Sequence, residues 1–173
     1  MRTFIAIDLP EKIKKETCKI QDSLPEFNGK KTEYENLHLT LKFLGEIDEK
    51  KLREVEERLR KIKLHNFEAE ISSIGVFSEQ HIRIAWLEIR NCDELQKKID
   101  ESLAGLFPKE ERFMGHLTIA RIKNVKNKRE FLEKLGKIKI PGMKFRADKF
   151  FLKESELTEE RPIYKNIEAY NLE

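Results

Sequence analysis

The sequence lacks the patterns that mark several common classes of protein. Its 173 residues include only two cysteines, Cys18 and Cys92, with no CxxC spacing. This predicts two free thiols in a reducing compartment rather than a disulfide framework. No apolar run approaches the roughly 20 residues that a membrane span requires, and the apolar stretch near the start is too short for a signal peptide. We therefore expect a soluble, cytoplasmic protein that does not contact membranes.

Motifs for metals and nucleotide cofactors are also missing. The sequence contains no HExxH, no Cys/His cluster, no Walker-type loop and no GxGxxG. The segment Asn28-Gly29-Lys30-Lys31 predicts a turn rather than a phosphate-binding loop. We therefore expect neither a bound metal nor a cofactor.

Charge is abundant but nearly balanced. Charged residues make up 39% of the chain, mostly Lys and Glu, while the formal net charge is only +3. This composition predicts a surface rich in ion pairs; it permits an RNA partner without requiring one, and there is no basic tail. Hydrophobic residues also make up 39%, which is enough for the core of one domain or of two tightly joined lobes.

Apolar periodicity and proline positions divide the chain into alternating short strands and helices. Leu52, Val55, Leu59 and Ile62, for example, recur at three- and four-residue steps and predict one apolar helix face. The predicted strands cover residues 2–8, 37–44, 67–77, 82–89, 116–121, 144–153 and 163–172, and the predicted helices cover 10–24, 49–63, 93–107 and 127–137.

The same strand motif occurs once in each half of the chain. His38-Leu39-Thr40-Leu41 and His116-Leu117-Thr118-Ile119 are 78 residues apart, and the flanking elements recur at about the same offset. An internal duplication of residues 1–78 and 79–173 explains this repetition. We therefore predict one α+β domain over 1–173: bilobal and pseudo-symmetric, with a largely antiparallel sheet in each lobe, helices outside, a central cleft, and lobes able to exchange terminal strands.

Strand alternation places the polar residues of both motifs on one face. His38 and Thr40 share a face, and the opposite face, directed at the core, carries Leu37, Leu39, Leu41 and Phe43. His116 and Thr118 likewise share a face, opposite Leu117 and Ile119. The other histidines, His65 and His81, lack this context and are predicted at the surface.

Two such pairs facing each other suit phosphate chemistry. An imidazole titrates near neutral pH, so one neutral histidine can activate a nucleophile while a protonated one donates to the leaving oxygen. In-line displacement needs this acid and base on opposite sides of the phosphorus, and the threonine hydroxyls can bind phosphoryl oxygens. The residues alone leave open which histidine is the acid.

The two motifs resemble the 2H phosphoesterase superfamily. Within it, the sequence resembles the RNA 2′,3′-cyclic phosphodiesterase family, historically called 2′-5′ RNA ligase, and this resemblance runs nearly end to end. It rests on residues 2–10, 36–46 and 116–121, with Ser155, Leu157, Pro162 and Tyr164 near the C-terminus. Two departures are Met114-Gly115, where the family often has a proline before the histidine, and Glu160-Arg161-Pro162, where Gly-Pro is usual.

The resemblance implies a bilobal fold, no cofactor, and hydrolysis of an RNA 2′,3′-cyclic phosphate to a 2′-phosphate. It implies that His38 is the proton donor, His116 the proton acceptor, and Thr40 and Thr118 phosphate ligands. A substrate such as a tRNA fragment and a monomeric state are consistent with it.

Three further side chains are candidates for the site. Arg121 is a candidate phosphate ligand, but strict alternation places it on the core face unless the strand ends or bulges there. Phe4 and Tyr164 could stack a base, although a core Phe and a structural Tyr are the favoured interpretation.

The sequence alone is also compatible with three alternative functions. An ATP-independent 2′-5′ RNA ligase would use the same displacement, with a 5′-hydroxyl in place of water. A non-catalytic RNA-binding module would keep the cleft without turnover, and intact motifs argue against it. A metal-dependent hydrolase is the last alternative, and a chelator would distinguish it.

Overall fold

The computed structural model describes residues 1–173 as an α+β fold with two antiparallel sheets. The strands are β1 Arg2–Asp8, β2 Asn28–Lys31, β3 His38–Glu46, β4 Phe67–Val76, β5 Ile84–Arg90, β6 His116–Asn124, β7 Met143–Ala147, β8 Lys149–Leu157 and β9 Pro162–Asn171. The helices are α1 Glu11–Asp22, α2 Glu49–Arg60, α3 Asp93–Ser102 and α4 Lys128–Gly136, with a short 3-10 helix η1 at Tyr34–Asn36.

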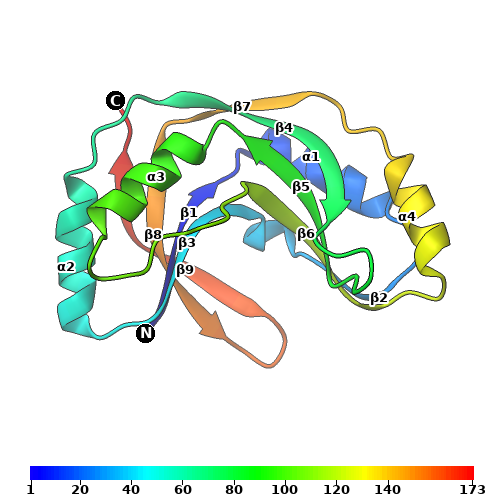
Figure 1. Cartoon of the computed structure of the whole chain (residues 1–173), viewed down its shortest axis with the longest axis horizontal. Coiled ribbons are helices and arrows are strands. Elements are labelled where there is room, and N and C mark those ends of the chain that lie inside the picture. The colour runs from blue at the N-terminus through cyan, green and yellow to red at the C-terminus, as the bar shows by residue number, and fades with distance from the viewer.

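Each half of the chain contributes strands to both sheets. The first sheet has the order β3-β1-β8-β9 and the second has the order β2-β6-β5-β4-β7. The C-terminal hairpin β8–β9 therefore completes the sheet of β1 and β3, while β4, from the first half, completes the sheet of β5 and β6. Figure 1 shows this hairpin projecting below the rest of the molecule, with the second sheet to its right. Strands β3 and β6, which begin with the two histidine motifs, approach each other where the sheets meet.

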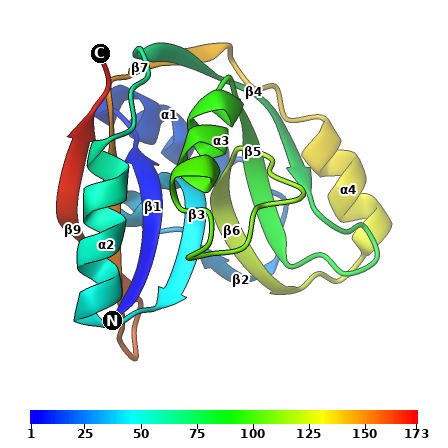
Figure 2. The ribbon, with the colours of Figure 1, turned by 60° about the vertical axis from the view of Figure 1, so that its left-hand side comes forward.

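The helices lie outside the sheets, and their ends follow familiar capping chemistry. The Asp48 side chain accepts a hydrogen bond from the Lys51 amide at the start of α2, and Asn127 does the same for Glu130 at the start of α4. Figures 1 and 2 show α2 and α4 at opposite edges of the molecule. None of the helices is long and apolar enough to cross a membrane.

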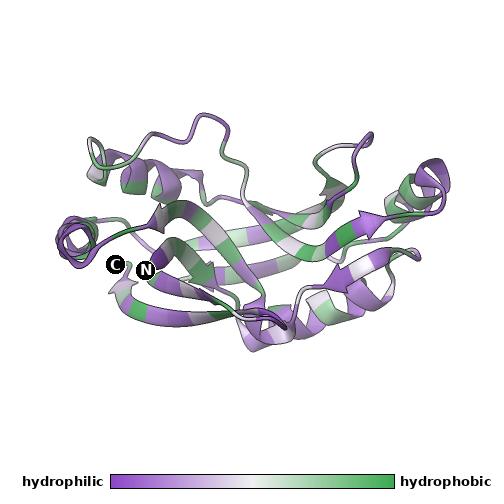
Figure 3. Cartoon of the chain, turned by 90° about the horizontal axis from the view of Figure 1, so that it is seen from below, coloured by the Kyte–Doolittle hydropathy of each residue, from purple (hydrophilic) through white to green (hydrophobic).

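One hydrophobic core runs through both sheets. It includes Ile5 and Leu39 of the first sheet together with Leu87 and Leu117 of the second, all of them fully buried. Hydrophobic and hydrophilic residues alternate along the strands in Figure 3. At the starts of β3 and β6 the alternation leaves one face for the core and the other for the site between the sheets.

Two sequence predictions about strands are wrong. Residues 28–31, predicted as a turn, form the edge strand β2, whose register pairs Lys30 with Arg121 of β6. The strand predicted at 144–153 is two strands divided at Asp148: β7 pairs with β4, and β8 pairs with β1 and β9. In both cases the pairing partner is distant in sequence, so local composition does not reveal it.

Candidate active site

A cleft of about 680 Å³ lies between the two sheets and brings together the residues that the sequence singled out. His38 and Thr40 line it from β3, and His116, Thr118 and Arg121 line it from β6. His65 and His81 are exposed and lie outside it, as predicted. A cleft of this volume is large enough for a small organic ligand.

Both imidazoles are oriented by the main chain in the same way. Nδ1 of His38 donates a hydrogen bond to the carbonyl oxygen of Asn36 at 2.7 Å, and Nδ1 of His116 donates to that of Met114 at 2.9 Å. A carbonyl oxygen only accepts, so Nδ1 carries the proton and Nε2 is left for proton exchange. Nε2 of His38 lies 2.8 Å from the Thr40 hydroxyl oxygen, so the two polar side chains of the first motif are in direct contact.

A β-bulge in each motif strand changes which side chains reach the cleft. The register of β1 and β3 skips Leu41, and that of β5 and β6 skips Ile119, three residues after each histidine. Beyond the bulge the alternation reverses, because the extra residue rotates the strand by one position. Arg121 is therefore exposed and lines the cleft, which strict alternation did not predict.

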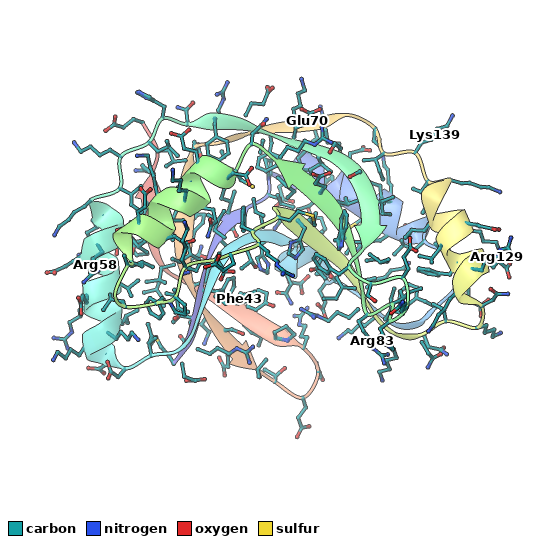
Figure 4. The ribbon with its side chains drawn as sticks, viewed as in Figure 1. Phe43, Arg58, Glu70, Arg83, Arg129 and Lys139 are labelled. Atoms are coloured by element: carbon teal, nitrogen blue, oxygen red, sulfur yellow. The ribbon has the colours of Figure 1, made fainter.

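The bulge at Leu41 of β3 makes the prediction for Phe43, which was assigned to the core, wrong. Phe43 is 67% exposed and lines the cleft, at the position of β3 that corresponds to Arg121 of β6. Figure 4 shows Phe43 near the middle of the molecule, whereas Arg58 and Arg129 project from helices at opposite ends. The two halves of the cleft thus present an aromatic ring on one side and a guanidinium on the other.

His38 lies in an aromatic and strongly desolvated environment. The rings of Phe4 and Tyr164 both lie close to its imidazole, each with a centroid 5.1 Å away, and Phe4 is buried as predicted. Burial lowers the pKa of His38 to about 4, the charges of Lys153 and Arg121 act in the same direction, and the hydrogen bond to Asn36 opposes them. The imidazole of His38 is therefore neutral at pH 7.

The cleft lining is rich in cations, and most of them are already paired. Lys30 contacts Glu33 at 2.7 Å, Lys31 contacts Asp22 at 3.2 Å, and Arg161 forms a salt bridge with Glu35. The side chain of Arg121 makes no salt bridge and no hydrogen bond, although it is exposed and lines the cleft together with Thr118. A free guanidinium in this position can bind two oxygens of an anion at once.

The second histidine is positioned by a tight approach of the main chain. A Cβ added to Gly115 would lie 2.3 Å from the Ile89 carbonyl oxygen and 2.4 Å from Cys92 Sγ. The Ile89 amide also donates a hydrogen bond to the Gly115 carbonyl oxygen at 2.8 Å. Only glycine leaves room for this contact, which explains the first departure from the family pattern noted in the sequence.

Sequence reasoning missed the structural role of Asn36. Its carbonyl oxygen accepts from His38, and its side-chain amide donates to the carbonyl oxygen of Pro162 at 2.9 Å. This buried residue therefore links the first histidine to the β8–β9 hairpin, which also carries Tyr164. A polar residue two positions before the motif histidine was the available signal.

A buried ion pair fixes the segment between α3 and β6. Lys42 Nζ lies 2.5 Å from Asp100 Oδ1 and also donates to the Pro108 carbonyl oxygen. Gln96 and the Glu110 amide donate to the other carboxylate oxygen. Burial raises the pKa of Asp100, but these hydrogen bonds outweigh burial and lower the pKa overall. The first motif strand thus holds the segment that leads to the second motif.

Two antiparallel sheets with a His-x-Thr strand from each on a shared cleft define the class of two-lobed phosphoesterases. The family described as LigT like phosphoesterase matches residues 7–86 and 88–164, and the chain belongs to this family.

Relatives with assigned names resemble the chain over nearly its whole length. A Methanocaldococcus jannaschii protein named RNA 2′,3′-cyclic phosphodiesterase is 38% identical and covers 98% of this chain and 100% of its own. A Thermotoga maritima protein of the same name is 38% identical over 95% of this chain and 92% of its own.

Solved structures show the same fold at lower identity. A Thermus thermophilus crystal structure superposes with a TM-score of 0.83 at 24% identity, covering 99% of this chain and 97% of that one. E. coli LigT complexed with 3′-AMP gives a TM-score of 0.76 at 23% identity, covering 99% and 97%.

Proposed function

We propose that this protein hydrolyses 2′,3′-cyclic phosphate ends of RNA to 2′-phosphates, without a metal. The observation that carries the proposal is the matched pair of imidazoles, each with Nδ1 bound to a main-chain carbonyl oxygen two residues earlier. The names of the Methanocaldococcus jannaschii and Thermotoga maritima relatives support the substrate class.

In this mechanism the phosphate lies between the two motif strands. His116 accepts a proton from the attacking water, and His38 donates a proton to the departing 3′ oxygen. The hydroxyls of Thr40 and Thr118 and the free guanidinium of Arg121 bind the phosphoryl oxygens. One chain supplies all of these groups, so we propose a monomer that acts on RNA ends such as tRNA fragments.

The low pKa of His38 makes its protonation depend on the substrate. An anionic phosphate placed against Nε2 favours the imidazolium and raises the pKa of His38, opposing the effect of burial. The proton that the leaving oxygen requires is then taken up when the substrate binds. In the absence of substrate, His38 remains neutral.

The test is to incubate the protein, in the presence of a chelator, with a short RNA that ends in a 2′,3′-cyclic phosphate, and to identify the product end group. We expect a 2′-phosphate, and a loss of rate of roughly 10²–10⁴ for His38→Ala and for His116→Ala. His65→Ala is a matched control, because that histidine is exposed and outside the cleft.

Other outcomes would contradict the proposal. Full activity in either motif variant would rule out the two-histidine mechanism. Activity that is lost in chelator and restored by zinc or magnesium would identify a metal-dependent hydrolase. RNA binding by the wild type without turnover would identify a binding module.

A further inference from the structure

A buried lysine of the first sheet has no part in the proposed mechanism. Lys153 of β8 is buried, and its Nζ lies 2.8 Å from Asp8 Oδ1 and donates a hydrogen bond to Asn166 Oδ1 at 2.7 Å. Lysine is almost never buried to this extent unless its charge is paired. Here the pairing carboxylate belongs to β1, the strand that lies between β8 and the first motif strand.

Strand register places this ion pair on the same face of the sheet as the first histidine. Asp8 is the direct partner of His38 between β1 and β3. Lys153 is the direct partner of Phe4 between β8 and β1, and the Phe4 ring contacts the imidazole with centroids 5.1 Å apart. Directly opposed residues share a face, with Cβ atoms roughly 5 Å apart. Both charges therefore act on the imidazole: Lys153 disfavours the imidazolium, and Asp8 favours it.

The second motif has a carboxylate at the same position but with different partners. Glu88 of β5 is the direct partner of His116, and so corresponds to Asp8 in the first motif. Its Oε2 accepts a hydrogen bond from the Ser73 hydroxyl at 2.8 Å, and its Oε1 lies 3.7 Å from the exposed Arg90. A hydroxyl carries no charge, and solvent screens an exposed guanidinium. The carboxylate beside the second histidine thus has no buried cation opposite it.

The remaining polar groups around His38 do not replace the effect of the buried lysine. Tyr164 of β9 lies edge-on to the imidazole, and burial raises its pKa, so its hydroxyl is neutral at pH 7. Arg121 of β6 also disfavours the imidazolium, but its guanidinium is the group expected to bind the phosphate. Lys153 is therefore the cation that still acts on His38 alone when substrate is bound.

We propose that Lys153 is a positioning residue that, by cancelling the charge of Asp8, makes His38 the proton donor of the two histidines. This inference rests on the proposed function. An imidazolium with no uncompensated carboxylate beside it releases its proton readily to the departing 3′ oxygen. The carboxylate of Glu88 instead opposes the positive charge that develops as His116 takes the proton of the attacking water. The two motifs are alike in sequence, and this difference in charge assigns their roles.

An NMR titration of His38 tests the charge effect without turnover. Lys153→Met leaves Asp8 unpaired beside the imidazole and should raise the midpoint of about 4 by about one pH unit. Lys153→Arg keeps the cation and should restore the wild-type midpoint, as should Lys153→Met combined with Asp8→Asn, which removes both charges. Lys153→Gln takes the place of Lys153→Met if the latter does not fold. An unchanged midpoint in the single variant, or the same rise in the double variant, would overturn the inference.

Two substrates test the role of the lysine in catalysis. One is an RNA with a 2′,3′-cyclic phosphate end, and the other carries sulfur in place of the 3′ oxygen, so that a thiolate departs without needing a proton donor. With saturating substrate, Lys153→Met should lower kcat roughly threefold for the oxygen substrate, because His38 becomes a weaker acid, and should leave the sulfur substrate unchanged. Equal losses with both substrates would indicate a purely structural role and overturn the inference.

Wild-type activity separates this inference from the proposed function. Absence of hydrolysis by the wild type would refute the proposed function and the inference with it. Hydrolysis by the wild type, with an unchanged kcat for the oxygen substrate in Lys153→Met, would overturn the inference alone.

Discussion

Acidification should destabilise the protein in part through His38. The unfolded chain has an ordinary imidazole that binds a proton near pH 6.5, whereas burial in the fold lowers the pKa of His38 to about 4. Between these two values the unfolded state binds more protons than the folded state does. The contribution of His38 to stability is therefore complete above about pH 6.5 and is lost as the pH falls toward 4.

The size of the effect follows from the difference in pKa. Lowering the pH from 7 to about 4.5 covers most of the range between the two pKa values. Over that range His38 should reduce the free energy of unfolding by about 2.5 kcal/mol. The carboxylates of Asp100 and Glu33, whose pKa values are also lowered, lose stabilising interactions in acid as well. Their effect is common to the wild type and to a His38 variant, so it cancels in a comparison.

His38→Gln is the informative variant, because glutamine keeps a polar side chain that does not titrate. Denaturant unfolding at about pH 7 and about pH 4.5 should show the wild type losing about 2.5 kcal/mol more than the variant. An NMR titration should place the His38 imidazole near pH 4 in the folded protein. If the wild type and the variant lost the same free energy of unfolding, or if the His38 imidazole titrated near pH 6.5, the desolvation of His38 would be refuted.

Four further predictions concern the cleft and its supports. If the bound phosphate raises the pKa of His38, the alkaline limb of kcat should lie at higher pH than that of kcat/KM; coincident limbs would contradict this. Lys42→Met should cost about 3–5 kcal/mol in denaturant unfolding, because Asp100 loses its cation, whereas adding Asp100→Leu should recover most of it. Gly115→Ala should lower kcat roughly 100-fold by displacing the second imidazole, and unchanged steady-state kinetics would refute the close contact. Arg121→Lys should lower kcat/KM roughly tenfold, because lysine cannot bind two phosphoryl oxygens side by side. A variant with the kcat/KM of the wild type would show that Arg121 does not bind the phosphate.

The two halves of the chain contribute strands to the two sheets in the same order. In each sheet a motif strand pairs with the first strand of its own half, β3 with β1 and β6 with β5, and the next strand comes from the other half. We propose that residues 1–78 and 79–173 arose by duplication and then exchanged the strands β4 and β8. The bulge at the same distance after each histidine is consistent with this proposal.

Arg121 illustrates the limit of reading a site from sequence. Alternation fixed the faces of His38 and Thr40, and of His116 and Thr118, because no irregularity separates the members of each pair. Arg121 lies beyond the bulge, which arises from pairing between β6 and β5, so alternation alone assigned it to the wrong face. Phe43 was misassigned to the core for the same reason.

The sequence by itself determined the positions of the helices, most of the strands and the duplicated His-x-Thr motif, because these depend on side-chain spacing within a short segment. The helix predicted at 93–107 nevertheless ends at Ser102, shortly before Gly105, which has a positive φ of 84°. Only the tertiary structure decided that residues 28–31 form a strand, that residues 143–157 divide between two sheets, and where the strands bulge. These features depend on hydrogen bonds between segments far apart in the chain. The hydrogen bond from the Asn36 side chain to the Pro162 carbonyl oxygen is of the same kind, since it forms only when distant segments meet.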